Sequence, residues 1–218
     1  MTPSEMNKAL TSLLIENMNS SGFKKKRTGV FWRKVNNCEQ YFSFSYTRDR
    51  GLPGTNYSMY PTLSFRYQKV DELHCLFMGK EYDDRERRFG TGSKGLYTLV
   101  PGSDSFRYKY SSKNPMNDHA ELIYKDFADY ALPFFDKYNS LDKVEAYFDK
   151  NRRYNREGFD VIRHNAYGCC IAAVLCANGK LEKCRQLLEE DGIVTDEQKA
   201  RIIEYIELQK SSSENARY

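Results

Sequence analysis

The sequence predicts an α+β fold, with an N-terminal helix packed on an antiparallel sheet of four to six strands and a helical C-terminal half. Apolar and polar residues alternate at a period of two through much of residues 29–111, and apolar residues recur at helical spacing from about residue 114 onward. Aromatic residues make up 14% of the chain, and such side chains favour pleated, half-buried surfaces. We therefore expect a sheet domain at residues 1–112, and a helical region at residues 113–218 that packs on it or forms a small subdomain.

The first element is predicted as a helix that begins after Thr2. The segment Thr2-Pro3-Ser4-Glu5 has the pattern of a capping box with proline at the first helical position, where its missing N–H has no cost. Gly22 is the expected stop, because glycine readily adopts the left-handed conformation that ends helices. The residues between them form one apolar stripe, made by Met6, Leu10, Leu13, Leu14 and Met18.

Strands are predicted after this helix, over residues 29–111, with turns between them. Asn36-Asn37 is expected to form a short hairpin turn and Gly51-Leu52-Pro53-Gly54 a longer one. Pro61 indicates that its strand lies at an edge or is broken there, since proline cannot donate to the ladder. The expected elements are strands at residues 29–35, 40–48, 57–68, 96–100 and 105–111, a short helix at 70–78 and a solvated loop at 79–95.

The second half is expected to be helical throughout. Pro133 interrupts an apolar stripe, and Ser140 is the expected cap of the next helix. The further predictions are a small-residue helix at 166–177 ended by Asn178-Gly179, a helix bearing Leu181, Cys184, Leu187 and Leu188, a last helix opened by Thr195 and Gln198, and a frayed tail at 211–213.

Charge and composition narrow the class of protein. The net charge of +4 divides into +7 over residues 1–112 and −3 over residues 113–218, and a basic first half favours an acidic partner. No apolar run reaches the roughly 18 to 20 residues that span a bilayer, and the N-terminus lacks the basic-then-apolar order of a signal peptide. Six cysteines without a secretory context indicate reduced thiols. We therefore predict a cytoplasmic protein with no membrane association and no cofactor.

One basic and aromatic surface is the leading candidate site. Residues 24–27 form the densest basic run and lead into an aromatic strand. Such a surface suits an acidic protein partner, or single-stranded nucleic acid held by phosphate neutralisation and base stacking. A solvated turn that keeps a sheet edge soluble is the alternative. The predicted binding residues are Lys24, Lys25, Lys26, Arg27, Trp32, Arg48, Arg50 and Arg66.

Two other motifs point to weaker site hypotheses. Gly90-Thr91-Gly92-Ser93-Lys94-Gly95 matches G-x-G-x-x-G, but a dinucleotide site needs a strand before it and a helix after it, so a flexible loop is expected. Adjacent cysteines on a helix point about 100° apart, which is unlike a structural zinc site, and buried small side chains are expected instead. The residues weighed for metal are Cys169, Cys170, Cys176, Cys184 and His164.

Catalytic candidates are scattered along the chain. A nucleophile and base such as Cys75 and a distant histidine would have to converge in space. Asp83 and Asp84 lie in a mixed-charge run that is typical of a solvated loop. No catalytic residue and no metal ligand is assigned. The histidines are His74, His119 and His164.

The opening of the chain resembles a bacterial family of domains of unknown function. The resemblance rests on an amphipathic helix, then Gly22-Phe23-Lys24-Lys25-Lys26, then Val30-Phe31-Trp32-Arg33, and covers residues 5–70. Leu132-Pro133-Phe134-Phe135 is similar to a second segment of the family, within residues 120–150. The family has no established activity, and the contexts of some members imply an immunity-type role that neutralises a toxin.

Three functions remain open from the sequence. The first is a non-catalytic cytoplasmic binding protein that engages a protein partner through the aromatic, basic sheet face or edge. The second is a nucleic-acid-binding module that uses the same surface. The third is an enzyme whose site is assembled from distant residues.

Overall fold

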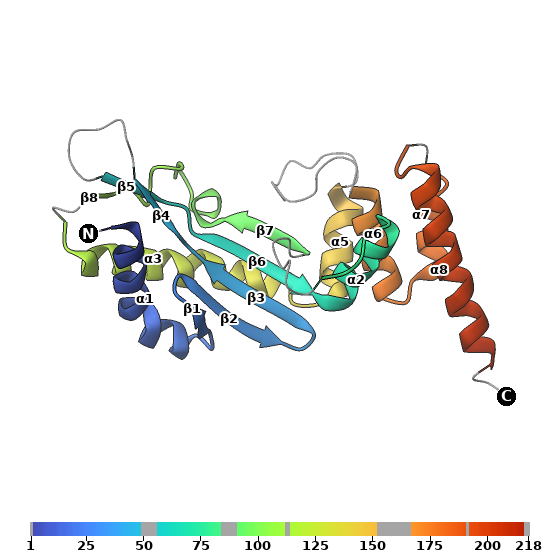
Figure 1. Ribbon diagram of the computed structural model, residues 1–218, viewed down its shortest axis with the longest axis horizontal. Coiled ribbons are helices and arrows are strands. Elements are labelled where there is room, and N and C mark those ends of the chain that lie inside the picture. Colours follow the sequence, from blue (N-terminus) through green and yellow to red (C-terminus); the bar gives the residue numbers. More distant parts are fainter. Residues whose placement is uncertain are drawn as a thin grey trace. The chain divides into compact units, whose positions relative to one another are not determined.

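The structure, a computed structural model, divides the chain into two compact units that interleave along the sequence (Figure 1). Unit 1 comprises Met1–Phe65 and Ser93–Tyr138, and unit 2 comprises Arg66–Gly92 and Asn139–Tyr218. Each unit therefore draws residues from both sides of the predicted division at residue 112. The structure describes residues 2–48, 56–83, 91–111, 114–151, 167–190 and 192–215.

Unit 1 is built on an antiparallel sheet of five strands, which confirms the predicted α+β class. A smaller sheet has the strand order β4-β5-β8. The strands of the larger sheet, in spatial order, are β1 (Lys24–Arg27), β2 (Val30–Val35), β3 (Cys38–Ser43), β6 (Thr62–Tyr67) and β7 (Gly92–Gly95). The strands of the smaller sheet are β4 (Tyr46–Arg48), β5 (Asn56–Met59) and β8 (Tyr110–Ser111).

The N-terminal helix α1 (Pro3–Ser20) begins and ends as predicted. The Glu5 N–H donates to the Thr2 hydroxyl at 3.3 Å, and the Glu5 carboxylate accepts from the Thr2 N–H at 2.7 Å. Gly22 ends the helix with a φ of +80°. The helix packs against strands β1 and β4 and against helix α3 (Met116–Asp126). Its buried side chains are Met6, Leu10, Thr11, Leu14 and Met18.

Two predicted strands are each divided, and both breaks carry the chain from one sheet to the other. Residues 40–48 form β3 and β4, with Phe44 at the break. The Phe44 N–H donates to the Gly29 carbonyl at 2.9 Å, and a Cβ at Gly29 would lie 2.5 Å from the Phe44 oxygen, so this approach requires glycine. Pro61 divides residues 57–68 into β5 and β6, which confirms the predicted break.

The predicted loop at 79–95 holds for residues 79–83 but is wrong at its end, and the predicted strand at 96–100 is wrong. Strand β7 forms at the end of the loop segment, while residues 84–90 lie outside the described residues. The next segment is a 3₁₀ helix, η1 (Leu96–Leu99). The Thr98 hydroxyl donates to the backbone carbonyl three residues before it at 2.7 Å, a local bond that competes with strand pairing.

The predicted strand at 105–111 is reduced to β8. Arg107 Nε and the Tyr108 hydroxyl both donate to the Asp126 carboxylate, at 2.5 and 2.9 Å. Adjacent residues of a strand point to opposite faces, so both could not reach one carboxylate from a strand. The buried Asp126 therefore turns this part of the backbone away from a sheet.

A helical segment runs behind the five-stranded sheet in Figure 1. Helix α3 continues through a π-helical turn, η2 (Phe127–Ala131), into α4 (Leu132–Lys137). The Leu132 N–H bonds to the Phe127 carbonyl five residues earlier. Pro133 follows at the start of α4, where its missing N–H is tolerated, so the predicted interruption is a wide turn in a continuing helix.

An aromatic layer joins this helical segment to the sheet. Phe42 lies 5.0 Å from Phe127 between ring centroids, and Phe23 lies 5.2 Å from Phe127 and 5.4 Å from Phe135. Gln40 Nε2 donates to the Phe135 carbonyl at 3.2 Å, so the buried amide is satisfied. We refer to this side of the sheet as the covered face; it carries Phe31, Arg33, Val35, Cys38, Gln40, Phe42, Leu63 and Phe65.

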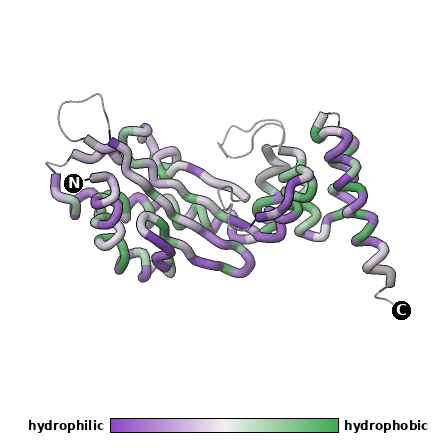
Figure 2. Tube along the Cα trace, in the orientation of Figure 1, coloured by the Kyte–Doolittle hydropathy of each residue, from purple (hydrophilic) through white to green (hydrophobic). Residues whose placement is uncertain are grey.

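Unit 2 is helical and is organised around α6 (Tyr167–Ala177), a hydrophobic stretch coloured green in Figure 2. This helix packs against the other helices of the unit. A Cβ at Gly168 would lie 2.0 Å from the Ile193 carbonyl oxygen, so α6 lies against this backbone only because the residue is glycine. Gly179, with a φ of +73°, ends the helix as predicted. The other helices are α2 (Gln68–Phe77), α5 (Leu141–Asn151), α7 (Leu181–Leu187) and α8 (Asp196–Asn215).

Two predicted helix starts in unit 2 are confirmed. The Ser140 hydroxyl accepts from the Lys143 N–H at 3.4 Å. The Thr195 N–H donates to Gln198 Oε1 at 3.0 Å while the Thr195 hydroxyl accepts from the Gln198 N–H at 3.3 Å. The frayed tail predicted at 211–213 is wrong, because α8 continues through it, and the hydroxyls of Ser211 and Ser212 bond to carbonyls of the preceding turn.

Candidate functional site

The basic run at residues 24–27 is an edge strand. Strand β1 comes first in the order of the five-stranded sheet and, among the described residues, pairs only with β2. All four of its side chains are exposed. The run has no apolar periodicity, so its strand conformation comes from the backbone ladder that β2 provides. Four positive charges therefore lie along one edge of the sheet.

The register sorts these charges between the two faces. Lys24 pairs with Trp32, which in turn pairs with Tyr41 across β2 and β3. Lys25 pairs with Phe31, which is fully buried on the covered face. Directly opposed residues of antiparallel strands share a face. Lys24 therefore projects on the side of the two half-exposed aromatic rings, and Lys25 projects on the other side.

Lys26 belongs with the aromatic pair. The register shifts between Lys25 and Arg27, which marks a β-bulge at this position. The Lys26 ammonium lies 5.3 Å from the Trp32 ring centroid and 4.8 Å from that of Tyr41, and it donates to the Tyr41 hydroxyl at 3.3 Å. At an exposed site each cation–π contact is worth about 0.5–1 kcal/mol, so lysine and rings hold one another in place.

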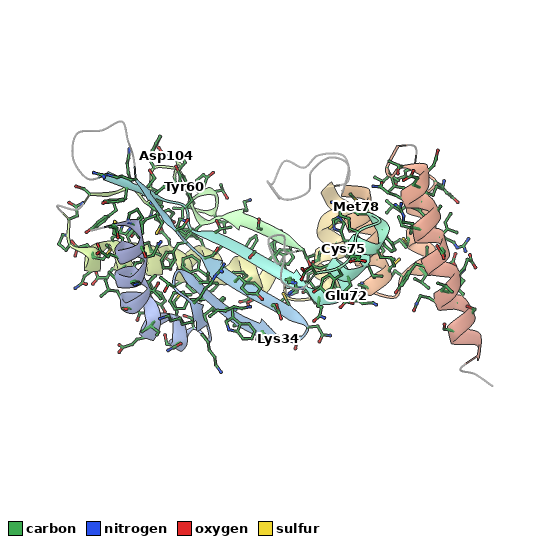
Figure 3. All side chains as sticks on the ribbon, viewed as in Figure 1. Lys34, Tyr60, Glu72, Cys75, Met78 and Asp104 are labelled. Carbon is green, nitrogen blue, oxygen red and sulfur yellow. The ribbon has the colours of Figure 1, made fainter. Side chains whose placement is uncertain are left out.

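The charged surface continues along the hairpin toward its turn. Lys34, labelled in Figure 3, pairs with Glu39 across the strands, and Glu39 also accepts from the Tyr41 hydroxyl. Arg27 pairs with Val30 and thus lies on the same side as Trp32. We refer to this surface as the open face; it consists of Lys24, Lys26, Arg27, Trp32, Lys34, Glu39 and Tyr41.

Arg33 shows why the covered face is unavailable to a partner. Its guanidinium lies 4.6 Å from the Phe23 ring centroid, and its Nε donates to Gln40 Oε1 at 2.6 Å. Its other nitrogens donate to the Ser21 carbonyl at 3.2 Å and lie 3.6 Å from the Asp136 carboxylate. Burial lowers the pKa of Arg33, and Asp136 offsets part of this effect. The donors of this arginine are thus used within unit 1.

The remaining predicted binding residues do not join the open face. Arg48 is exposed, but it lies on β4 in the smaller sheet. Arg50 lies outside the described residues. Arg66 is only 5% exposed, and its Nε donates to the Asp71 carboxylate at 2.6 Å in unit 2. Its NH2 group also bonds to the Tyr82 hydroxyl, so this arginine is a structural residue.

The sequence contained a signal for Tyr41 that the predicted site did not use. Asn36 has a φ of 54°, which suits a tight hairpin turn. A two-residue turn fixes the register of both strands, so the expected turn at residues 36–37 places Tyr41 opposite Trp32. Counting outward from the turn of a hairpin can thus identify a cross-strand aromatic pair from the order of residues alone.

The cysteines of α6 and α7 are core side chains. Burial raises the pKa of Cys169 to about 11 and that of Cys170 to about 12, so both are protonated at neutral pH. The sulfurs of Cys176 and Cys184 lie 3.6 Å apart, and both side chains are buried. His164 lies outside the described residues. Within the part of the chain that the structure describes, no three His, Cys, Asp or Glu residues form a group that could hold a metal ion.

The glycine motif does not form a phosphate-binding turn where it is described. Gly90 lies outside the described residues, and Gly92–Gly95 is a strand rather than the expected flexible loop. The segment that follows is the short 3₁₀ helix η1. A dinucleotide site needs the N-terminus of an α-helix at this point, and the chain does not supply one.

The described histidine and cysteine candidates lack the features of an activated pair. His119 packs against the rings of Tyr46 and Tyr110, at centroid distances of 5.9 and 5.1 Å, and burial lowers its pKa to about 4. Burial, with a contribution from Asp71, raises the pKa of Cys75. A nucleophilic cysteine requires the opposite shift, because the thiolate is the reactive form.

Comparison with known proteins does not change this set of candidates. No family model, curated protein or solved structure matches the chain. No helix in the described ranges has the length and apolar character needed to cross a membrane. The resemblance to the bacterial family stays a prediction from its motifs, and the open face is the surface on which a function can be argued.

Proposed function

We propose that this chain is a non-catalytic binding protein that engages an acidic region of a protein partner through the open face. The observation that carries the proposal is the exposed cluster in which Lys26 lies against Trp32 and Tyr41. Tryptophan, tyrosine and arginine are enriched where proteins bind one another, and the open face carries Trp32, Tyr41 and Arg27. Four basic residues and one acidic residue on the open face match a partner of negative charge.

The position of Lys26 favours a protein over single-stranded nucleic acid. A stacked base needs a free ring face, because stacking provides much of the affinity at such sites. The Lys26 ammonium lies over both Trp32 and Tyr41, so a base could stack there only after the lysine moved away. An acidic side chain instead approaches the ammonium directly and keeps the contacts with the rings.

We further propose a cytoplasmic location and an immunity-type role. None of the six cysteines, all of which lie within the described residues, forms a disulfide, as is usual in the reducing environment of the cytoplasm. The immunity-type role rests on the family resemblance, and neutralisation of an acidic protein by a basic surface is consistent with it. An enzymatic role for Cys75 or His119 would need an activated thiol or imidazole. Burial instead raises the pKa of the Cys75 thiol and lowers that of the His119 imidazole, which moves both away from neutral pH.

The proposal is tested by capture of partners from the native host on wild-type protein and on Trp32→Ala and Lys24→Glu variants. A partner of the open face is captured by the wild type and lost from both variants. The matched controls are Tyr60→Ala, an aromatic side chain that is 46% exposed elsewhere in unit 1, and Lys8→Glu, an exposed lysine on α1. Both controls should capture the partner normally.

Two results would overturn the proposal. One is a partner retained by Trp32→Ala and Lys24→Glu at the wild-type level. The other is an oligothymidylate that binds the wild type more tightly than the captured protein does, with an affinity that falls steeply with salt and is lost in Trp32→Ala. The second result would establish the nucleic-acid function in its place.

A further inference from the structure

We infer that the partner is held by strand addition, in which an extended acidic segment pairs with the outer edge of β1 and lengthens the five-stranded sheet. This inference rests on the proposed function and specifies its geometry. Strand addition combines main-chain hydrogen bonds with side-chain contacts on both sides of the added strand. Three features of β1 support it: its place in the sheet, its charge and the direction of its side chains.

Strand β1 has the exposure that strand addition requires. It is terminal in the sheet order, and all four residues of Lys24–Arg27 are exposed. An edge strand directs alternate N–H and C=O groups away from its neighbour, where another strand can bond to them. The other terminal strand, β7, is partly covered along its length and carries one basic residue, Lys94. Strand β1 is therefore the favoured edge.

The charge of β1 selects the incoming strand. Like charges directly opposed across two strands are destabilising, so two copies of this chain would repel one another along their β1 edges. Lysine and β-bulges on edge strands are common means by which proteins prevent self-pairing. A segment of carboxylates reverses the sign of every cross-strand contact with Lys24–Arg27. The same residues thus exclude a second copy and admit an acidic strand.

Both faces of the added strand would meet basic side chains. On the open face its neighbours are Lys24 and Arg27, with the Trp32 and Tyr41 pair next to them. On the opposite side its neighbour is Lys25. Successive residues of a strand point to opposite faces, so the structure favours a run of consecutive acidic residues rather than an alternating pattern.

The first test uses the full chain and a labelled peptide of consecutive glutamates flanked by threonines. Binding is followed by fluorescence anisotropy and by the emission of Trp32, the one tryptophan of the sequence. N-methylation of alternate amides leaves one edge of the peptide able to pair, and N-methylation of every amide leaves none. We expect the alternately methylated peptide to bind within about twofold of the parent, and the fully methylated peptide to lose at least about tenfold.

Hydrogen exchange on the wild-type protein provides an independent readout. Peptide binding should slow exchange of the outward-facing amides of Lys24–Arg27, and leave the amides of β7 unchanged. A lysine peptide of the same length should neither bind nor protect. Equal affinity of the alternately and fully methylated peptides, or the absence of protection in β1, would overturn strand addition, as would no binding of the glutamate peptide at low salt.

A charge-reversal series separates this inference from the proposed function. Strand addition predicts that Lys24→Glu and Lys25→Glu each weaken peptide binding about fivefold, while Lys8→Glu on α1 does not. Docking on the open face alone predicts that Lys25→Glu, which projects to the other side, binds as the wild type does. That result would overturn strand addition and leave the proposed function standing. Unchanged binding in Trp32→Ala and Lys24→Glu would overturn both.

Discussion

Both faces of the five-stranded sheet place a cation against an aromatic ring, but in different surroundings. On the covered face the Arg33 guanidinium lies 4.6 Å from the Phe23 ring centroid and is also bonded to Gln40 and to a backbone carbonyl. On the open face the ammonium of Lys26 lies 5.3 Å from the Trp32 ring centroid and remains exposed. The same type of contact therefore stabilises the fold on one face and presents charge on the other.

Adjacent residues of β3 give the largest expected contrast between the faces. Phe42 is fully buried and packs against Phe127, whereas Tyr41 is half-buried on the open face. Phe42→Ala should lower the free energy of unfolding by about 3–5 kcal/mol, because it removes a buried ring and leaves a cavity. Tyr41→Ala should lower it by about 1 kcal/mol or less. Urea denaturation measures both, and similar losses would contradict the assignment of the two faces.

Acid should destabilise the helical side of unit 1 through His119. Its pKa is about 4 in the folded chain and 6.5 when unperturbed, so the unfolded chain binds more protons between these values. The contribution of His119 to the free energy of unfolding is therefore fully present above the unfolded pKa. About 2–3 kcal/mol of it is lost as pH falls from 6.5 through 4. Thermal denaturation across this range should show the slope. His119→Phe keeps the ring but cannot titrate, and an unchanged slope in that variant would refute the assignment.

Arg33→Met tests whether the enclosed cation stabilises the covered face. The variant keeps the apolar stem but leaves Gln40 Oε1 and the Ser21 carbonyl without this donor. We expect a loss of about 2 kcal/mol in the free energy of unfolding, typical of hydrogen bonds from a charged group. Binding of the partner should not change in the folded protein. A loss of binding with unchanged stability would place Arg33 in the interface instead.

Lys26→Met should have the smallest effect on stability. Removal of the two exposed cation–π contacts, to Trp32 and Tyr41, should together cost about 1 kcal/mol by urea denaturation. The tryptophan emission should change as well, because the ammonium no longer lies over the Trp32 ring. Partner affinity should fall in parallel. A stability loss as large as that of Arg33→Met would show that the two cations play the same role.

Local patterns in the sequence were sufficient for much of the fold. The capping box at Thr2 and the helix start at Thr195 were predicted because their hydrogen bonds involve residues close in sequence. The alternation in β2 and β3, and the turn at Asn36, predicted the central hairpin for the same reason. Breaks at Phe44 and Pro61 connect two sheets, and only the proline break has a local signal.

The features that the sequence did not predict depend on tertiary contacts. Residues 105–109 alternate like a strand, but the buried carboxylate of Asp126 draws two adjacent side chains to one point. Arg66 was assigned to the basic surface from its charge and its position in the sequence. It is instead bound to Asp71, on the helix that follows. For the candidate site, Trp32 and the basic run were predicted, whereas the separation of Lys24 from Lys25 depends on strand pairing.

The bulge in β1 increases the number of basic side chains that this short edge strand places on one face of the sheet. A regular strand of this length would turn two side chains to each face. With the register shift, Lys24, Lys26 and Arg27 all project on the side of the sheet that carries Trp32, and Lys25 alone projects the other way. The insertion of one residue thus raises the charge density beside the aromatic pair without lengthening the strand. Deletion of one residue from β1 would remove the register shift and with it this excess of charge on one side.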